Sequence, residues 1–141
     1  IISVHTDNIP VDSRDIYVDG EVDVFGGLMF DDIDLTSIRI RGRGNSTWFL
    51  SKKPYQIKFD TKTSVLGLPE DRKWVLLAEY SDKSLIRNKM AYQMGAMSSL
   101  DYTPKGEYVE FFLNDNHQGT YILAQKVEES SNRVNIGDEG Y

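Results

Sequence analysis

Residues 37–60 read SIRIRGRGNSTWFLSKKPYQIKFD, and an alternating run stands on either side of a central loop. Within residues 37–43 isoleucine alternates with arginine, and within residues 53–60 apolar side chains alternate with Gln56 and Lys58. Successive side chains of a strand point to opposite faces, so a period of two predicts a β-strand in each run. The stretch therefore predicts two strands joined by a glycine-containing loop.

Further elements are expected outward from this stretch. Short apolar or alternating runs predict other strands at residues 1–6, 15–25, 74–78, 108–113 and 120–124. Between Ile86 and Met97 the apolar residues recur at helical spacing, and Ser81 or Asp82 is a suitable N-cap. We expect an α+β fold, with a mostly antiparallel sheet packed against one main helix at about residues 83–97. This order of elements also resembles that of part of a diverged kinase-like small lobe. The polar tail 128–141 is expected to be a loop.

The composition narrows the classes of partner. The chain has 141 residues, suited to one domain, with 16 basic and 22 acidic residues and a net charge of −6. Nucleic-acid-binding domains carry a basic excess, so nucleic acid is not an expected partner. No run of residues approaches the ~20 apolar residues of a membrane-spanning helix. There is no cysteine, and His5 and His117 are far apart, so no metal site is predicted.

The basic residues gather in residues 39–58, which favours a small anionic ligand over a polymer. Three arginines lie on one face of the predicted strand, followed by Gly42 and Gly44 and by the short polar side chains of residues 45–47. Such a loop can bring backbone N–H groups close to a phosphate, and Lys52 or Lys53 could neutralise it. A solvated strand edge, with arginines paired to carboxylates and lysines exposed, explains the same residues. Both interpretations stay open on composition alone.

The start of the predicted helix is a second candidate region. Asp82 suits a structural role as the helix cap. Arg87 lies beside the apolar stripe, where it could form a buried ion pair or reach a ligand.

The order of several blocks resembles the CotH family of spore-coat-type atypical protein kinases. The blocks are RGRGNSTW (41–48), KKPY (52–55), WVLLA (74–78), DKSLIRN (82–88), YVEFFLN (108–114), QGTY (118–121) and NRV (132–134). The resemblance implies an ATP- and Mg²⁺-dependent phosphotransferase with a diverged kinase-like fold, acting on acceptor proteins that are secreted or at the bacterial cell surface. An extracellular or cell-envelope location follows from the same resemblance.

The resemblance also assigns residues. Arg43, Gly44, Asn45 and Ser46 would form the nucleotide-side loop, and Lys53 would face the phosphates. Two further groups have supporting roles: one would hold the helix start against that site, and the other would form a structural hairpin signature. Asp82 and Arg87 belong to the helix start, and Asn114, Gly119 and Tyr121 belong to the hairpin.

Two departures limit these expectations. Gln125 stands where relatives commonly have glutamate, and the metal-binding aspartates of the family lie beyond Tyr141. We therefore expect residues 1–141 to be a single domain or fragment, the N-terminal part of a CotH-like domain, with no catalytic residue of its own and inactive alone. The alternative is a non-catalytic surface-binding or scaffold module, or a carbohydrate-binding module if Trp48 is exposed.

Overall fold

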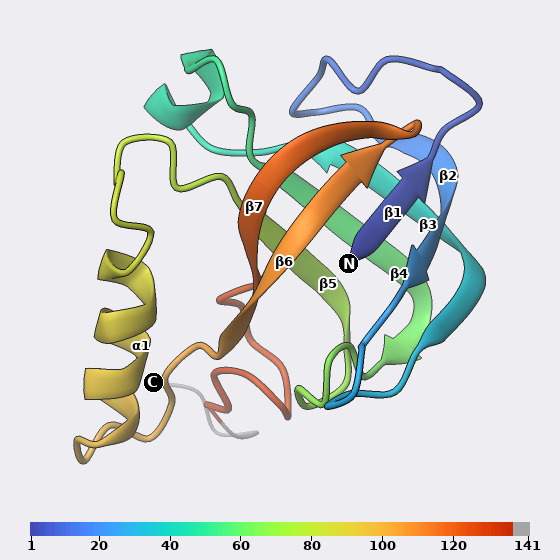
Figure 1. Ribbon diagram of the computed structural model, residues 1–141. Helices are drawn as coiled ribbons and strands as arrows, with labels where there is room; N and C mark the ends of the chain where they lie inside the picture. The colour runs from blue at the N-terminus through green and yellow to red at the C-terminus, as the bar shows by residue number, and fades with distance from the viewer. Residues whose placement is uncertain (137–141) are drawn as a thin grey trace.

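Seven strands close into a barrel in the computed structural model, which describes residues 1–136 (Figure 1). The predicted strands all form, although their ends differ from the predicted ones. Their bounds are β1 (Ile2–His5), β2 (Val18–Val24), β3 (Ile33–Gly42), β4 (Tyr55–Thr63), β5 (Asp71–Leu77), β6 (Gly106–Leu113) and β7 (Asn116–Gln125). A short 3-10 helix, η1 (Ser46–Phe49), follows β3, and α1 (Arg87–Ala96) follows β5.

The alternation in residues 37–60 directs one face of β3 and β4 into the barrel. Ile38 lies opposite Phe59, and Ile40 lies opposite Ile57, in an antiparallel register. All four side chains are buried, and they join Trp74, Phe111 and Tyr121 from the other strands in one core. Burial of this apolar surface is the main source of stability for the barrel.

Closure of the barrel depends on β1. This strand pairs antiparallel with β2 and parallel with β6, with Ile2 opposite Phe111. Figure 1 shows β1 lying between them. The tip of the β6–β7 hairpin also contacts the end of β1: the Asn114 side chain accepts a hydrogen bond from the Thr6 amide at 2.7 Å and donates one to the Thr6 hydroxyl at 2.9 Å.

The predicted α+β fold, a sheet packed against one main helix like part of a kinase small lobe, is wrong. The sheet closes on itself and forms its own interior, and α1 contributes no buried residue. Local alternation predicts strands, but closure depends on the pairing of β1 with β6, which are about a hundred residues apart. Such pairing leaves no signal in any short window of sequence.

The apolar stripe of the predicted helix faces solvent. Met90, Met94 and Met97 are 54%, 67% and 79% exposed, because the opposite side of α1 meets the barrel. That contact is made by Tyr92, which packs on Val75, Ile122 and Ala124 on the outer face of the strands. Within residues 1–136, no helix has the length and hydropathy needed to cross a membrane.

Candidate anion-binding cavity

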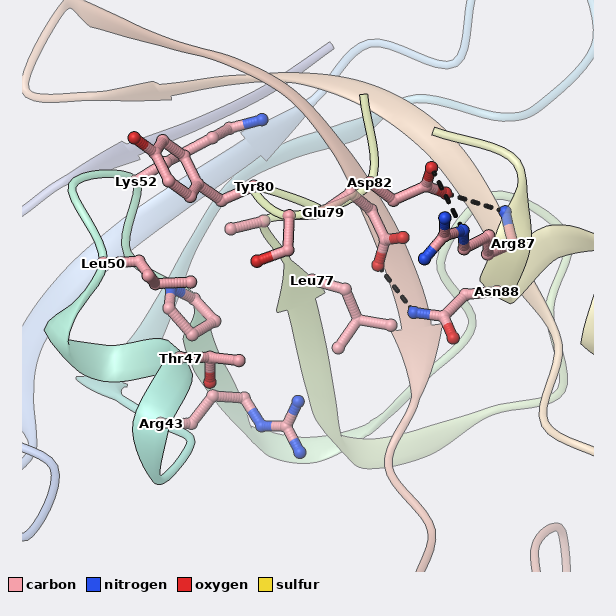
Figure 2. A pocket seen from close by; sticks show the side chains of 13 residues that line it. Arg43, Thr47, Leu50, Lys52, Leu77, Glu79, Tyr80, Asp82, Arg87 and Asn88 are labelled. Atoms are coloured by element: carbon pink, nitrogen blue, oxygen red, sulfur yellow. Dashed lines mark hydrogen bonds and ion pairs between the residues drawn. The ribbon is translucent and has the colours of Figure 1, made fainter. Parts of the chain in front are cut away.

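Two loops at one end of the barrel face each other across a cavity of about 310 Å³. One loop joins β3 to β4 and the other joins β5 to α1. Figure 2 shows Arg43, Thr47 and Leu50 on the first side, and Glu79, Asp82 and Asn88 on the second. The full lining is Arg43, Thr47, Leu50, Lys52, Pro54, Leu77, Ala78, Glu79, Tyr80, Ser81, Asp82, Arg87 and Asn88.

The first loop is held by close packing at its base. The Arg43 amide donates to the Pro54 carbonyl at 3.1 Å, which extends the pairing of β3 with β4 beyond Gly42. The ring of Trp48 packs directly on Gly42, where a Cβ would overlap it. Gly44 has a φ of +93°, a conformation that glycine adopts without strain. These contacts place Arg43 at the cavity wall.

Arg43 is a half-buried cation in this wall. Desolvation lowers the pKa of its guanidinium, and the nearby Tyr92 opposes that effect. Within residues 1–136, its side chain makes no ion pair with a carboxylate. A buried charge without a counter-ion is costly, so this position is suited to an anionic ligand.

Lys52 supplies a second cation to the same cavity. Its ammonium donates to the Thr120 carbonyl at 2.5 Å and lies 4.4 Å from the centre of the Tyr121 ring. Desolvation lowers the pKa of Lys52, and the charges of Glu110 and Glu79 partly oppose that effect. The charge is therefore fixed in place and partly removed from water.

Asp82 organises the start of α1. Its carboxylate accepts hydrogen bonds from the Ser84 hydroxyl at 2.6 Å, the Ser84 amide at 3.1 Å and the Arg87 amide at 2.9 Å. The hydrogen bonds from Ser84 and from the Arg87 amide lower the pKa of Asp82. The N-cap position itself belongs to Ile86, so Asp82 satisfies the first helical amide from outside the helix.

Glu79 was not predicted from the sequence. It has a positive φ of 50°, and its carboxylate accepts a hydrogen bond from the Asn88 side chain at 2.7 Å. Leu85, at the other end of the same loop, has a φ of 58°. Strained residues of this kind gather at binding sites, where the surrounding structure holds them. No periodicity marks Glu79, because it follows the point where β5 ends.

One protein-family model matches most of the chain. A family model described as CotH kinase protein matches residues 38–141. The chain belongs to the CotH family. It is also 32% identical to the inner spore coat protein H of Bacillus subtilis (strain 168) over 96 residues, which are 65% of this chain and 24% of that protein. This CotH-family chain therefore spans about a quarter of the length of the curated relative that it matches.

The cavity brings together only part of the residue set that the CotH resemblance assigned. Arg43 and Arg87 line it, together with Asp82. Gly44 and Asn45 instead line a second, more open hollow of about 390 Å³, with Arg14, Asp15, Arg41, Gly42 and Arg43. Ser46 begins η1 and lines neither hollow.

Lys53, the lysine assigned to the phosphates, points elsewhere. Its ammonium donates to the Trp48 carbonyl at 2.5 Å and lies 5.2 Å from the centre of the Trp48 ring. Its carbonyl accepts a hydrogen bond from the Tyr121 hydroxyl at 2.8 Å. The neighbouring Lys52 lines the cavity instead, where its ammonium packs on the Tyr121 ring.

The remaining CotH-family positions have structural contacts. Asn114 and Asp115 both have positive φ, as a tight hairpin turn requires, and Gly119 has a φ of +99°. Gln125 is buried, and its side-chain oxygen accepts hydrogen bonds from the Lys105 amide at 3.0 Å and the Tyr102 hydroxyl at 3.4 Å. An amide in place of the usual glutamate therefore has partners for its oxygen and needs no counter-ion.

Mg²⁺, which the CotH family implies, does not fit the residues that the structure describes. Residues 1–136 contain no group of three or more histidine, aspartate or glutamate side chains that could hold a metal ion. The two carboxylates of the cavity, Glu79 and Asp82, already accept hydrogen bonds from Asn88, Ser84 and Arg87. The phosphates of ATP fit better, because Arg43, Lys52 and Arg87 are cations in one cavity.

Proposed function

We propose that this chain binds the phosphates of ATP as part of a CotH-type protein kinase, a phosphotransferase that modifies acceptor proteins. One observation carries the proposal: Arg43 and Lys52 line one cavity, both partly desolvated and neither ion-paired within residues 1–136. A triphosphate would supply the missing negative charge. The family assignment supports ATP as its source.

The cavity also suits the size and hydrogen bonding of such a ligand. Its volume of about 310 Å³ lies at the lower end of the range for small-molecule sites. The Arg87 guanidinium is 3.7 Å from the Asp82 carboxylate, but the Arg87 side chain is 82% exposed and can turn toward a ligand at the rim. Asn88, Ser81 and Thr47 add uncharged hydrogen-bonding groups.

In phosphoryl transfer, fixed cations mainly position the phosphates and stabilise negative charge. Lys52 is suited to this role because Tyr121 and the Thr120 carbonyl fix its ammonium before a ligand arrives. Arg43 offers a planar group that can bind two phosphate oxygens at once. The chain's own residues thus bind and orient the nucleotide.

The relative is named as an inner spore coat protein, so we propose a spore-coat or cell-surface location for the present protein. The acceptor would be a protein of the same location. The structure gives less support to a carbohydrate-binding module. The Trp48 ring packs on Gly42 and contacts Tyr55 edge-on at 6.4 Å, and Lys53 lies over it, which leaves little open ring face for a sugar.

Thermal unfolding of the full-length protein tests the proposal. Saturating Mg-ATP should raise the melting temperature by a few degrees, since a ligand at a hundred times its Kd adds about 2.7 kcal/mol of stability. Arg43→Met and Lys52→Met should remove most of this rise. Lys53→Met is the matched control and should retain it. No rise in the wild-type protein at millimolar Mg-ATP would favour a non-catalytic binding module.

A further inference from the structure

Three basic side chains form a row across the outer face of the barrel. Arg39 of β3 lies directly opposite Lys58 of β4, and Lys58 lies directly opposite Lys73 of β5. Their neighbours in sequence, such as Ile38, Ile57 and Trp74, fill the core, so the basic side chains point outward. We call Arg39, Lys58 and Lys73 the cationic row. It is separate from the cavity between the loops, whose lining contains none of the three.

Like charges in directly opposite positions of a sheet are unfavourable. In the part of the chain that the structure describes, carboxylates form ion pairs only with the two ends of the row. The Arg39 guanidinium is 3.6 Å from the Asp60 carboxylate, which is 68% exposed. The Lys73 ammonium is 2.8 Å from the Glu128 carboxylate. Within residues 1–136, the side-chain ammonium of Lys58 at the centre has no hydrogen-bond or ion-pair partner.

Glu128 shows that the cationic row binds a carboxylate. It lies on the irregular segment after β7, and its carboxylate also bonds the Lys126 ammonium at 2.8 Å. Partial burial by itself raises the pKa of Glu128, but the hydrogen bonds from Lys126 and Lys73 outweigh it and leave the pKa below its usual range. A carboxylate carried by a non-strand peptide segment therefore already occupies one end of the row.

The surroundings of the row limit the size of any further anion. On the outer face of β2, Asp19 lies opposite Arg39, and Glu21 follows two residues later. Glu128 bounds the other end, and the net charge of the chain is −6. A long polyanion such as nucleic acid, or an anionic membrane surface, would meet these acidic groups. A single anionic side chain is small enough to reach Lys58 and Arg39 between these acidic groups, with Asp60 as a close carboxylate neighbour at Arg39.

We propose that the cationic row is a docking site for a partner-protein segment that carries a carboxylate or phosphate side chain, which Lys58 and Arg39 bind. The site does not require nucleotide binding. Arg41, two residues from Arg39 on the same face, extends the positive surface, and its buried Nε has no hydrogen-bond partner. The strand spacing of ~4.8 Å lets one anionic group reach both Arg39 and Lys58.

Fluorescence anisotropy with the full-length protein tests this site. Three labelled peptides share a neutral sequence and differ at one position, which is glutamate, phosphoserine or serine. The glutamate or the phosphoserine peptide should bind, and the difference between them identifies the anionic group. Equal binding of the serine peptide would overturn the proposal. So would equally effective competition by a short DNA duplex or by vesicles containing anionic lipid, because the site would then not be selective for a protein segment.

Two variants should change the affinity in opposite directions. Lys58→Met should weaken binding of the anionic peptide about tenfold, since it removes a charge-assisted hydrogen bond. Glu128→Gln should strengthen it about threefold, because Lys73 is then freed for the ligand. Lys83→Met, with the same loss of charge in the loop after β5, is the control and should bind as the wild type does. Unchanged binding by Lys58→Met, or no gain by Glu128→Gln, would contradict the proposal.

Folding and nucleotide binding provide separate readouts. Lys58→Met relieves repulsion within the row, so its melting temperature should equal or exceed that of the wild type. It should retain the rise in melting temperature with Mg-ATP. Lys52→Met should lose that rise and still bind the anionic peptide. A failure of nucleotide binding and a failure of the docking site are therefore distinguishable.

Discussion

The guanidinium of Arg133 lies 4.8 Å from the centre of the Trp74 ring, and its side chain is fully buried. The same guanidinium is 3.9 Å from the Asp71 carboxylate, which also accepts a hydrogen bond from the Ser130 hydroxyl at 2.5 Å. These contacts hold the segment after β7 across the end of the barrel. That segment also carries Glu128 to the cationic row, so its anchoring shapes the proposed docking site.

Asp71→Asn should destabilise the protein by about 3 kcal/mol at neutral pH, because it leaves the buried Arg133 without a counter-ion. Burial by itself raises the pKa of Asp71, but hydrogen bonds from Ser130 and the Arg72 amide, with the charge of Arg133, lower it overall. A carboxyl with a lowered folded-state pKa stabilises above its unfolded pKa of about 3.9, and the effect is lost as pH falls through the folded value. Denaturant unfolding should therefore show the deficit at neutral pH and a smaller one in acid.

Asp60→Asn is the matched control. Asp60 is exposed and lies 3.6 Å from Arg39, so its loss should change the free energy of unfolding by less than about 0.5 kcal/mol. Equal effects of the two substitutions would show that Asp71 and Arg133 do not interact strongly in solution.

The sequence was most informative where structure is local. Alternation within residues 37–60 correctly predicted β3 and β4. The closed barrel was missed because the pairing of β1 with β6 is not local. Lys52 and Lys53 are adjacent residues of one type, and the sequence could not tell which one lines the cavity, because their packing on Tyr121 and Trp48 decides it.

For the helix, the sequence was misleading. The apolar stripe predicted a buried methionine face, but α1 packs on the barrel through Tyr92 and its methionines are exposed. Tyr92→Ala should destabilise the protein by about 2 kcal/mol, because Tyr92 packs on Val75, Ile122 and Ala124. Met94→Ala should change stability by less than about 0.5 kcal/mol, because Met94 is 67% exposed. Chemical denaturation of both variants measures this contrast. A larger loss for Met94→Ala would place the buried face of α1 on its methionine side.

Gly42 gives a test of how the first loop is positioned. Gly42→Ala would place a methyl group within the volume of the Trp48 ring, so the ring and η1 must move. Overpacking of this kind costs about 1–3 kcal/mol. Thermal unfolding should show this loss, and Mg-ATP should stabilise the variant less than the wild type. Ser51→Ala, at an exposed position of the same loop, should match the wild type in both measurements.

Lys52 gives the cavity a characteristic dependence on pH. Desolvation lowers the pKa of its ammonium in the ligand-free protein, so Lys52 loses its proton at a lower pH than an exposed lysine does. A bound anion favours the charged form and raises that pKa. Affinity for Mg-ATP should therefore fall as pH rises through the lowered pKa, and binding in that pH range should take up protons.

Isothermal titration calorimetry measures this uptake directly. The observed binding enthalpy should vary with the ionisation enthalpy of the buffer at alkaline pH, and the dependence should vanish near neutral pH, where Lys52 is already charged. Lys52→Met should weaken binding and abolish the buffer dependence at alkaline pH. Lys53→Met should keep it, because Lys53 donates to the Trp48 carbonyl outside the cavity. Proton uptake that persists in Lys52→Met would assign the titrating group to another residue and remove Lys52 from the phosphate site.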